Sequence, residues 1–244
     1  MLDIQNVGLK VEENGEEITI LDNINLNIEE GKIYVITGPN GGGKTTLSKL
    51  LMGIRKPSSG KIIFNGENIT NLDINERAKL GIGYAFQQPV RFKGIKVKEL
   101  LEIAAKADEK KDLDLCKVLL DVGLCPQDYL NREINNSLSG GELKRIEIAT
   151  ILVRDLKLAV FDEPEAGIDL WSFQKLVETF KNLNREKKLT LVIISHQERI
   201  IQLADEVIII SEGKIEKKTS KDEILPKVTF GVECGCNAVC ERRN

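Results

Sequence analysis

Gly38-Pro39-Asn40-Gly41-Gly42-Gly43-Lys44-Thr45 is the stretch that decides the fold. It matches the pattern G-x-x-x-x-G-K-[ST] and lies between an apolar run at 33–37, a predicted buried strand, and a predicted helix at 45–52 that ends at Gly53. The glycines let successive backbone N–H groups curl around a phosphate, and the helix N-terminus adds the positive end of its dipole. A flexible turn before a surface helix is the alternative, which the flanking strand and helix disfavour.

The stretch therefore predicts a site for a nucleoside triphosphate. Lys44 is expected to reach the β- and γ-phosphates, and the Thr45 hydroxyl is expected to bind Mg²⁺. The residues predicted to contact the phosphates are Gly38, Pro39, Asn40, Gly41, Gly42, Gly43, Lys44, Thr45 and Thr46.

The composition sets bounds on the remainder of the chain. At 244 residues and 41% hydrophobic content, the chain can bury a core in one or two lobes. A net charge of −3 argues against an obligatory nucleic-acid partner. No apolar run reaches the about 18 residues that cross a bilayer, and residues 1–10 lack a signal-peptide pattern. A soluble, cytoplasmic protein is expected.

An odd number of cysteines, five, argues against structural disulfides, and Cys116 and Cys125 are expected to be small core residues.

Two patterns of secondary structure follow one another along the chain. Short apolar segments at 2–9, 18–21 and 24–28, with turn signals within residues 2–31, and again at 61–64 and 67–69, predict an antiparallel sheet. Further on, predicted helices alternate with predicted strands, which implies a mostly parallel sheet and an α/β fold. The helices are expected at 97–105, 113–122, 140–153 and 171–182, the strands at 82–86, 158–161 and 189–195, and a closing hairpin at 206–210 and 214–217.

Four predicted strands end at reactive or polar residues. They are the strands at 33–37, 82–86, 158–161 and 191–195, followed in turn by the phosphate-loop stretch, Gln87, the pair Asp162-Glu163, and His196. Ligands of open α/β sheets gather at the carboxyl ends of the strands, so neighbouring strands would bring all four to one nucleotide.

Each of these side chains has a predicted role and a plainer alternative. Asp162 suits a carboxylate that holds Mg²⁺, and Glu163 is placed to act as general base on water, although an acidic pair can simply begin a solvated turn. Gln87 could bridge Mg²⁺ and the water, or be a surface amide, and the adjacent Gln88 is an alternative. His196, the single histidine, is expected to contact the γ-phosphate or the water, rather than to be a structural residue.

Leu138-Ser139-Gly140-Gly141-Glu142 has two explanations that use the same physics. Ser-x-x-Glu before a helix is a capping box. A serine-capped, glycine-opened helix start also presents bare N–H groups and a positive dipole end to an anion.

The order of these motifs closely resembles that of the ABC-type ATPases over residues 1–220. The resemblance implies an ABC-type P-loop fold: a mostly parallel sheet flanked by helices, an antiparallel β side sheet, and a helical subdomain at about 88–155 within one domain, followed by a tail at 221–244. It implies that two copies meet head to tail and hydrolyse MgATP to ADP and phosphate. The signature residues Ser139, Gly140, Gly141 and Glu142 of one copy would then face the γ-phosphate held by Lys44 of the other.

Two departures from the family pattern stand out. The family often stacks an aromatic side chain on adenine, but residues 9–20 contain none, so Val11 or a nearby aliphatic residue is expected to serve. The loop after Glu163 contains Ala166-Gly167-Ile168-Asp169 where the family often has Ser-Ala-Leu-Asp. It keeps Asp169, which the resemblance assigns to communication between the two copies.

Two classes of ABC ATPase remain open. The segment Ala85-Phe86-Gln87-Gln88-Pro89-Val90 is similar to that of SufC-like ATPases of iron–sulfur cluster assembly, as is the segment from Asp162 to Asp169. That resemblance implies a SufB/SufD-like scaffold bound to residues 87–137. The alternative is the nucleotide-binding subunit of a membrane transporter, which would receive its permease at the same region.

The C-terminal end carries Cys234, Cys236 and Cys240 within seven residues. Thiolates at this density suit zinc or an iron–sulfur cluster. The spacing matches no strong four-ligand pattern, so a tail with unused thiols stays equally open.

Overall fold

The computed structural model describes residues 1–13, 15–92, 94–106 and 113–229. Its centre is a six-stranded sheet in the order β10-β9-β3-β8-β7-β6, in which only β10 runs antiparallel to its neighbour. The strands are β3 (Ile33–Thr37), β6 (Ile82–Ala85), β7 (Leu158–Asp162), β8 (Thr190–Ile194), β9 (Glu206–Ser211) and β10 (Lys214–Thr219). The mostly parallel sheet predicted from the sequence is confirmed.

The five parallel strands of this sheet are buried on both faces, which explains why they are mostly apolar, whereas β10 at the edge is charged and largely exposed. Along β3, Tyr34 and Ile36 join one apolar cluster, whereas Ile33 and Val35 join a second cluster on the opposite face. Side chains in a strand alternate between faces, so each of the five parallel strands contributes to both clusters.

The second sheet is antiparallel, with the order β2-β1-β4-β5. Its strands are β1 (Leu2–Glu13), β2 (Glu16–Ile28), β4 (Ser59–Phe64) and β5 (Glu67–Asn68). The sequence predicted two separate segments where β2 is continuous. Asn23 lies within β2 with a φ of 51°, and the register with β1 shifts nearby, so the strand bulges instead of ending. Asparagine tolerates this left-handed backbone better than most residues.

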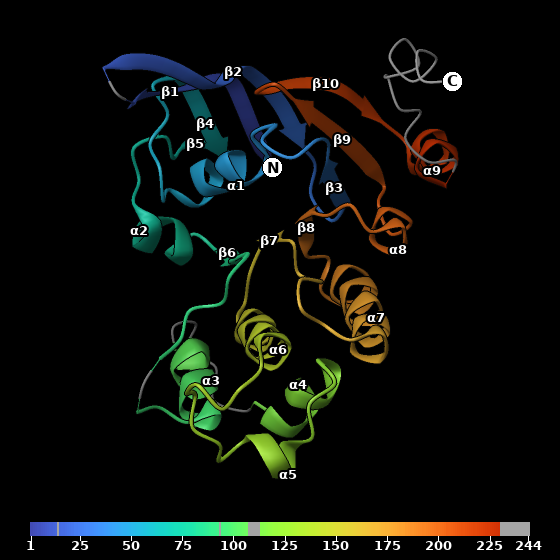
Figure 1. Cartoon of the computed structure of the whole chain (residues 1–244). Helices are drawn as coiled ribbons and strands as arrows, with labels where there is room; N and C mark the ends of the chain where they lie inside the picture. Colours follow the sequence, from blue (N-terminus) through green and yellow to red (C-terminus); the bar gives the residue numbers. More distant parts are fainter. Residues whose placement is uncertain (14, 93, 107–112, 230–244) are drawn as a thin grey trace, which may run out of the picture.

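Helices cover the faces of the sheets and form a lobe of their own. They are α1 (Lys44–Met52), α2 (Ile74–Lys79), α3 (Val97–Lys106), α4 (Leu115–Asp121), α5 (Pro126–Tyr129), α6 (Gly140–Leu152), α7 (Leu170–Lys187), α8 (Glu198–Ile201) and α9 (Lys221–Thr229). Figure 1 shows α3, α4, α5 and α6 together at one end of the molecule and the antiparallel sheet at the other, with the central sheet between them.

The helix that follows the phosphate loop is fixed by a buried arginine. Arg77 of α2 is fully buried, and its NH1 donates to the carbonyls of Leu50 and Leu51 at 2.6 and 2.8 Å. These carbonyls belong to the last turn of α1, where carbonyls run short of intrahelical donors; the N–H of Gly53 also donates to the Leu50 carbonyl, at 3.1 Å. Burial lowers the pKa of Arg77 to about 10, so the guanidinium stays charged at neutral pH and caps α1.

Three further expectations concern the cysteines, the tail after residue 220 and membrane-spanning helices. Cys116 and Cys125 are exposed, so the prediction that they are core residues was wrong: both lie on the outer side of short helical segments. The predicted tail begins with a helix, α9, whose Ile224 is buried, whereas Cys234, Cys236 and Cys240 lie outside the described residues. Among the helices of the described chain, none combines the length and the apolar character needed to cross a membrane.

Candidate active site

A cleft of about 250 Å³ opens over the phosphate loop. Its lining consists of Ile20, Asn40, Gly41, Gly42, Gly43, Lys44, Thr45, Thr46, Gln87 and Glu163. The central sheet thus brings the ends of β3, β6 and β7 to one place. The sequence predicted four strand ends here, but His196, which follows β8, is not among the residues that line this cleft. Ile20 comes from β2 and is the aliphatic residue at this cleft, whereas Val11 packs against the apolar cluster beneath the antiparallel sheet.

Backbone contacts hold the phosphate loop. The N–H of Gly42 donates to the carbonyl of Pro39 at 3.2 Å, and the N–H of Gly213, in the turn between β9 and β10, donates to the carbonyl of Gly42 at 3.0 Å. Gly38 has a φ of 135°, and a Cβ there would lie 2.0 Å from the carbonyl oxygen of Ile210. Only glycine fits this position, because the neighbouring atom is backbone and cannot move aside.

The Lys44 ammonium lies folded into the loop that it follows. Its Nζ donates to the carbonyls of Gly38 and Pro39, each at 2.8 Å, and the residue is only 6% exposed. Burial lowers the pKa of Lys44, and the carboxylates of Glu163 and Asp162 partly oppose that shift. A buried cation at the start of a helix favours an anionic ligand at the same point.

Asp162, at the end of β7, is fully buried within a set of hydroxyl groups. Thr45 Oγ1 donates to its Oδ1 at 3.2 Å, and the Tyr84 hydroxyl donates to its Oδ2 at 3.0 Å. Burial raises the pKa of Asp162, while the hydrogen bonds from Tyr84 and Thr45 lower it. Thr45 lines the cleft, and the Asp162 carboxylate is hydrogen-bonded to its hydroxyl; these are the hard oxygen donors that Mg²⁺ takes, so the residues present fit this ion.

Glu163 follows directly and turns toward the cleft. Its backbone has a φ of 46°, which is rare for a residue other than glycine, and its N–H donates to the carbonyl of Ile194 at 3.0 Å. Gln87 Nε2 donates to Glu163 Oε2 at 2.8 Å. Gln87, rather than Gln88, is therefore the amide beside this carboxylate. Strained backbone of this kind concentrates at functional sites, where the surrounding structure maintains it.

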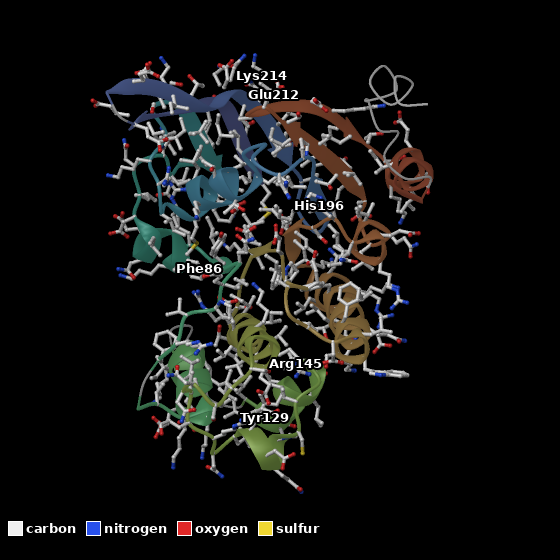
Figure 2. All side chains as sticks on the ribbon, viewed as in Figure 1. Phe86, Tyr129, Arg145, His196, Glu212 and Lys214 are labelled. Atoms are coloured by element: carbon white, nitrogen blue, oxygen red, sulfur yellow. The ribbon has the colours of Figure 1, made fainter. Side chains whose placement is uncertain are left out.

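His196 lies just beyond β8, near the middle of the molecule in Figure 2. Its Nδ1 is 3.3 Å from Thr37 Oγ1, the hydroxyl that closes β3. Burial and the nearby Lys44 ammonium lower the pKa of His196, so the neutral ring is favoured at neutral pH. The ring is placed at the same sheet edge as the phosphate loop.

Lys144 is a buried cation that sequence reasoning missed. Its side chain is 1% exposed, and its Nζ donates to the carbonyl of Asp162 at 3.2 Å and also to that of Phe86. Glu147 Oε2 lies 3.5 Å from the same Nζ. Burial lowers the pKa of Lys144 and raises that of Glu147. The pair connects α6 to the segments that carry Gln87 and Asp162, and nothing local in the sequence marks it.

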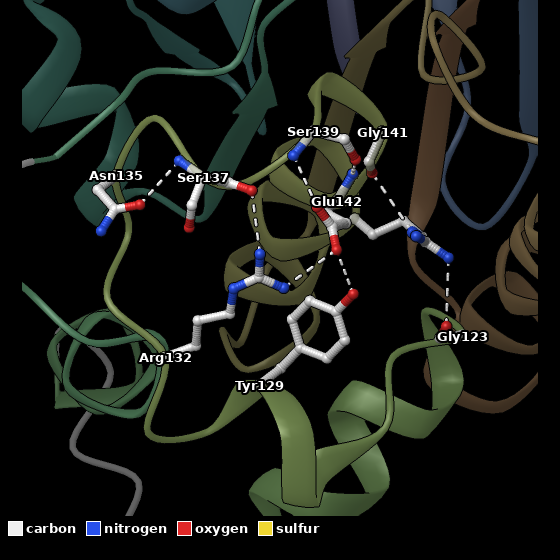
Figure 3. Close-up of polar contacts among 9 residues, drawn as sticks. Gly123, Tyr129, Arg132, Asn135, Ser137, Ser139, Gly141 and Glu142 are labelled. Atoms are coloured by element: carbon white, nitrogen blue, oxygen red, sulfur yellow. Dashed lines mark hydrogen bonds and ion pairs between the residues drawn. The ribbon is translucent and has the colours of Figure 1, made fainter.

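The signature residues start α6 with a capping box. Ser139 Oγ accepts from the N–H of Glu142 at 3.2 Å, and Glu142 Oε2 accepts from the N–H of Ser139 at 2.6 Å. Figure 3 shows that the other oxygen of Glu142 is held by Tyr129 and Arg132. Burial by itself raises the pKa of Glu142, but the hydrogen bonds from Tyr129 and Ser139 and the charge of Arg132 lower it to about 2.

The start of α7 packs against the signature residues. Asp169 caps α7 by accepting from the N–H groups of Trp171 and Ser172 at 3.1 and 3.0 Å. Its Oδ2 lies 4.0 Å from NH1 of Arg145, a residue of α6. A Cβ on Gly141 would lie 2.4 Å from the carbonyl oxygen of Gly167, so the two segments are in close contact.

The signature residues and the cleft are separate within one copy. Ser139, Gly140, Gly141 and Glu142 do not line the cleft. Over the described ranges, no hydrogen bond joins them to the phosphate loop, Gln87 or Glu163. We call these two separate groups of residues the phosphate-loop half-site and the signature half-site.

The chain is similar to known proteins over most of its length. A family model described as ABC transporter matches residues 21–166. An uncharacterized ABC transporter ATP-binding protein of Methanocaldococcus jannaschii is 42% identical over 223 residues, 88% of each chain. A probable ATP-dependent transporter, ycf16, of Pyropia yezoensis is 35% identical over 84% of this chain and 86% of that one. The ATP-binding cassette MJ0796, solved as a dimer in a post-hydrolysis state with ADP and Pi, superposes with a TM-score of 0.82 at 25% identity, covering 91% of this chain and 99% of that one.

Proposed function

The chain belongs to the ABC transporter family as an ATP-binding, Mg²⁺-dependent ATPase cassette, and we propose that two copies close head to tail around the nucleotides. The observation that carries the proposal is the separation of the two half-sites: a cleft with the phosphate loop, Gln87 and Glu163, and a signature helix start directed elsewhere. The cassette MJ0796 was solved as a dimer bound to ADP and Pi, which supports a dimer here.

Within this arrangement each side chain at the cleft has a proposed part. Glu163 accepts the proton of the attacking water, and the Gln87 amide orients the carboxylate by its hydrogen bond at 2.8 Å. Thr45 and Asp162 would hold Mg²⁺, which supplies positive charge to the β- and γ-phosphates. Lys44 adds a fixed charge beside the same phosphates, and His196 contacts the γ-phosphate from the end of β8. The products are ADP and phosphate.

The proposed base is tested by Glu163→Gln. The amide keeps the size of the side chain but cannot take a proton, so we expect turnover to fall by about 10²–10⁴-fold with nucleotide binding retained. The variant should elute from gel filtration as a dimer with MgATP and as a smaller species with ADP. Glu178→Gln, an exposed position on α7 outside the cleft, is the matched control and should keep wild-type turnover. Undiminished turnover of Glu163→Gln would show that the base is misassigned.

We further propose that the ATPase drives conformational change in a SufB/SufD-like scaffold for iron–sulfur cluster assembly. The support is the resemblance of the segments at 85–90 and 162–169 to SufC-like ATPases. A second support is an apolar groove between β6 and the helical lobe, at which Val90, Phe92 and Ile103 are 49%, 43% and 57% exposed. Apolar side chains gathered on a surface in this way are typical of a protein contact.

The alternative is a nucleotide-binding subunit of a membrane transporter, which would place its permease in the same groove. The relatives' descriptions as ABC transporter and ATP-dependent transporter proteins support it. Affinity capture from an anaerobic native lysate, with soluble and membrane fractions analysed separately, discriminates the two. A soluble SufB-like partner that carries iron and sulfide supports cluster assembly, whereas a multi-span membrane protein supports transport.

The cysteines at the C-terminal end are part of the proposal only through their chemistry. Cys234, Cys236 and Cys240 would bind zinc or an iron–sulfur cluster during assembly. Within the part of the chain that the structure describes, no group of His, Cys, Asp and Glu side chains is placed to do so. Replacing all three cysteines by serine should impair cluster transfer and leave ATP turnover unchanged; unimpaired assembly would remove the role.

A further inference from the structure

We propose that Arg132 and Tyr129 are positioning residues for the signature: they hold the Glu142 carboxylate on the N–H of Ser139, in the capping box, so that the N–H groups of Gly140 and Gly141 are free for the γ-phosphate of the second copy. The inference rests on the proposed head-to-tail arrangement and deepens it. Neither residue belongs to a motif, and both lie before the signature in sequence.

Both oxygens of the Glu142 carboxylate have hydrogen-bond partners. Its Oε1 accepts from the Tyr129 hydroxyl and from NH1 of Arg132, the latter at 3.2 Å. Arg132 also donates from NH2 to the carbonyl of Ser137 at 3.0 Å, and its guanidinium lies 5.3 Å from the centre of the Tyr129 ring. Figure 3 shows this guanidinium between Ser137 and Glu142, with a dashed line to each.

The consequence concerns the donors at the helix start. The capping box uses the N–H groups of Ser139 and Glu142. In the described chain, the N–H groups of Gly140 and Gly141 have no hydrogen-bond partner, as expected for the first turn of a helix. They are the donors that an approaching anion would meet.

The charge of Glu142 makes its orientation important. A carboxylate at a helix start stabilises the helix, but a carboxylate turned toward the phosphate side would repel the ligand and compete for the same N–H groups. The hydrogen bonds from Tyr129 and Arg132 to Oε1 keep the Glu142 side chain in the orientation that leaves those N–H groups free. A planar guanidinium does this while it also reaches the Ser137 carbonyl and packs on the Tyr129 ring, which a lysine ammonium cannot do at once.

Turnover of single variants is the first test. For Arg132→Met we expect about a tenfold loss of turnover, because the variant lacks the hydrogen bond from Arg132 to the charged Glu142 carboxylate, which holds that carboxylate away from the N–H groups of Gly140 and Gly141. Arg132→Lys and Tyr129→Phe should each show a smaller loss. The affinity for ADP, which one phosphate loop binds alone, should not change. Arg185→Met removes an exposed arginine from α7 and is the matched control. An Arg132→Met variant as active as the control would overturn the proposal.

A mixing experiment separates positioning from a general fault in folding. Lys44→Met removes the phosphate-binding cation of one copy but leaves its signature intact. Adding it to Arg132→Met should therefore raise turnover several-fold, because the phosphate loop of Arg132→Met is paired with an intact signature. Gly140→Asp is the reference: a Cβ there meets nothing within 4 Å, so the variant should fold, and its charge should repel the phosphate.

Each outcome of the mixing experiment decides one point. Rescue of both Gly140→Asp and Arg132→Met supports the positioning role. Rescue of Gly140→Asp alone means that Arg132 acts within its own copy, which overturns the positioning role and leaves the head-to-tail arrangement standing. Rescue of neither contradicts the head-to-tail arrangement, and the positioning role falls with it.

Discussion

The phosphate-loop half-site and the signature half-site are built from different kinds of contact. The phosphate loop is held by backbone: the hydrogen bonds of Gly42 with Pro39 and Gly213, and the close approach of Gly38 to the carbonyl of Ile210. The signature has one close backbone approach, of Gly141 to the carbonyl of Gly167, but Glu142 at its helix start is held by the side chains of Tyr129 and Arg132. Backbone contacts tolerate no bulkier residue, whereas side-chain contacts can be weakened step by step.

The difference in contacts fits the part that each half-site has in the proposed head-to-tail arrangement. The loop must surround the β- and γ-phosphates in every copy, so a single rigid geometry is sufficient. In the proposed arrangement the signature forms its contacts only when a second copy closes, and its helix start is carried by the helical lobe rather than by the buried sheet. A half-site whose shape depends on side chains can respond to a partner bound to that lobe.

The strongest test of the comparison is a single methyl group at Gly38. Gly38→Ala should abolish nucleotide binding and lower the free energy of unfolding by about 2–4 kcal/mol, because its Cβ would lie 2.0 Å from a backbone oxygen. Calorimetric titration with ATP and a thermal melt measure the two effects. In the same loop, Gly41→Ala meets no atom within 4 Å and is strained only by its φ of 78°, so it should lose about 1 kcal/mol and keep nucleotide affinity within a few-fold. Equal losses for the two variants would show that the backbone approach is unimportant.

The same distinction explains what could be predicted from the sequence. The strands that position Gln87, Asp162 and His196 were predictable because both faces of the central sheet are buried, which produces continuous apolar runs. The phosphate loop was predictable because its glycines are required at fixed spacing. By contrast, the prediction divided β2 into two segments, which was wrong. Asparagine is typical of turns, but the left-handed Asn23 forms a bulge within the strand.

The remaining features depend on contacts between distant residues. Ile20 reaches the cleft only because the antiparallel sheet packs beside the phosphate loop, and no local pattern marks it. Arg132 contacts Glu142 across the loop that precedes α6, and Lys144 of α6 donates to carbonyls at the ends of β6 and β7. Such side-chain contacts follow from the tertiary fold, so the fold must be known before they can be assigned.

A second test concerns the contact between α6 and the start of α7. Asp169→Ala should lower the free energy of unfolding by about 1 kcal/mol, because two N–H groups at the start of α7 lose their cap. Asp169→Asn keeps a capping oxygen and should restore most of that stability. It removes the charge near Arg145, so a loss of turnover in Asp169→Asn without a loss of stability would assign Asp169 to communication between copies. Wild-type turnover in both variants would contradict that assignment.

The smallest expected effect is a dependence on pH within the signature half-site. The pKa of Glu142 is lowered in the folded chain to about 2, below its ordinary value near 4.5. A carboxyl with a lowered pKa contributes stability that is complete above its unfolded pKa and declines as the pH falls toward the folded one. Glu142→Gln keeps the capping box but lacks this charge. We expect it to be about 0.5–1 kcal/mol less stable than the wild type at pH 7, because neutral hydrogen bonds replace charged ones. The difference should narrow between pH 5.5 and 4, as the unfolded chain takes up its proton. Thermal melts of the two proteins across that interval measure it. The matched variant Glu178→Gln on α7, outside the signature half-site, should show no such narrowing. A difference that stays constant with pH would mean that the Glu142 charge is not what holds the signature, and the contrast between the two half-sites would then rest on the hydrogen bonds of Tyr129 and Arg132 alone.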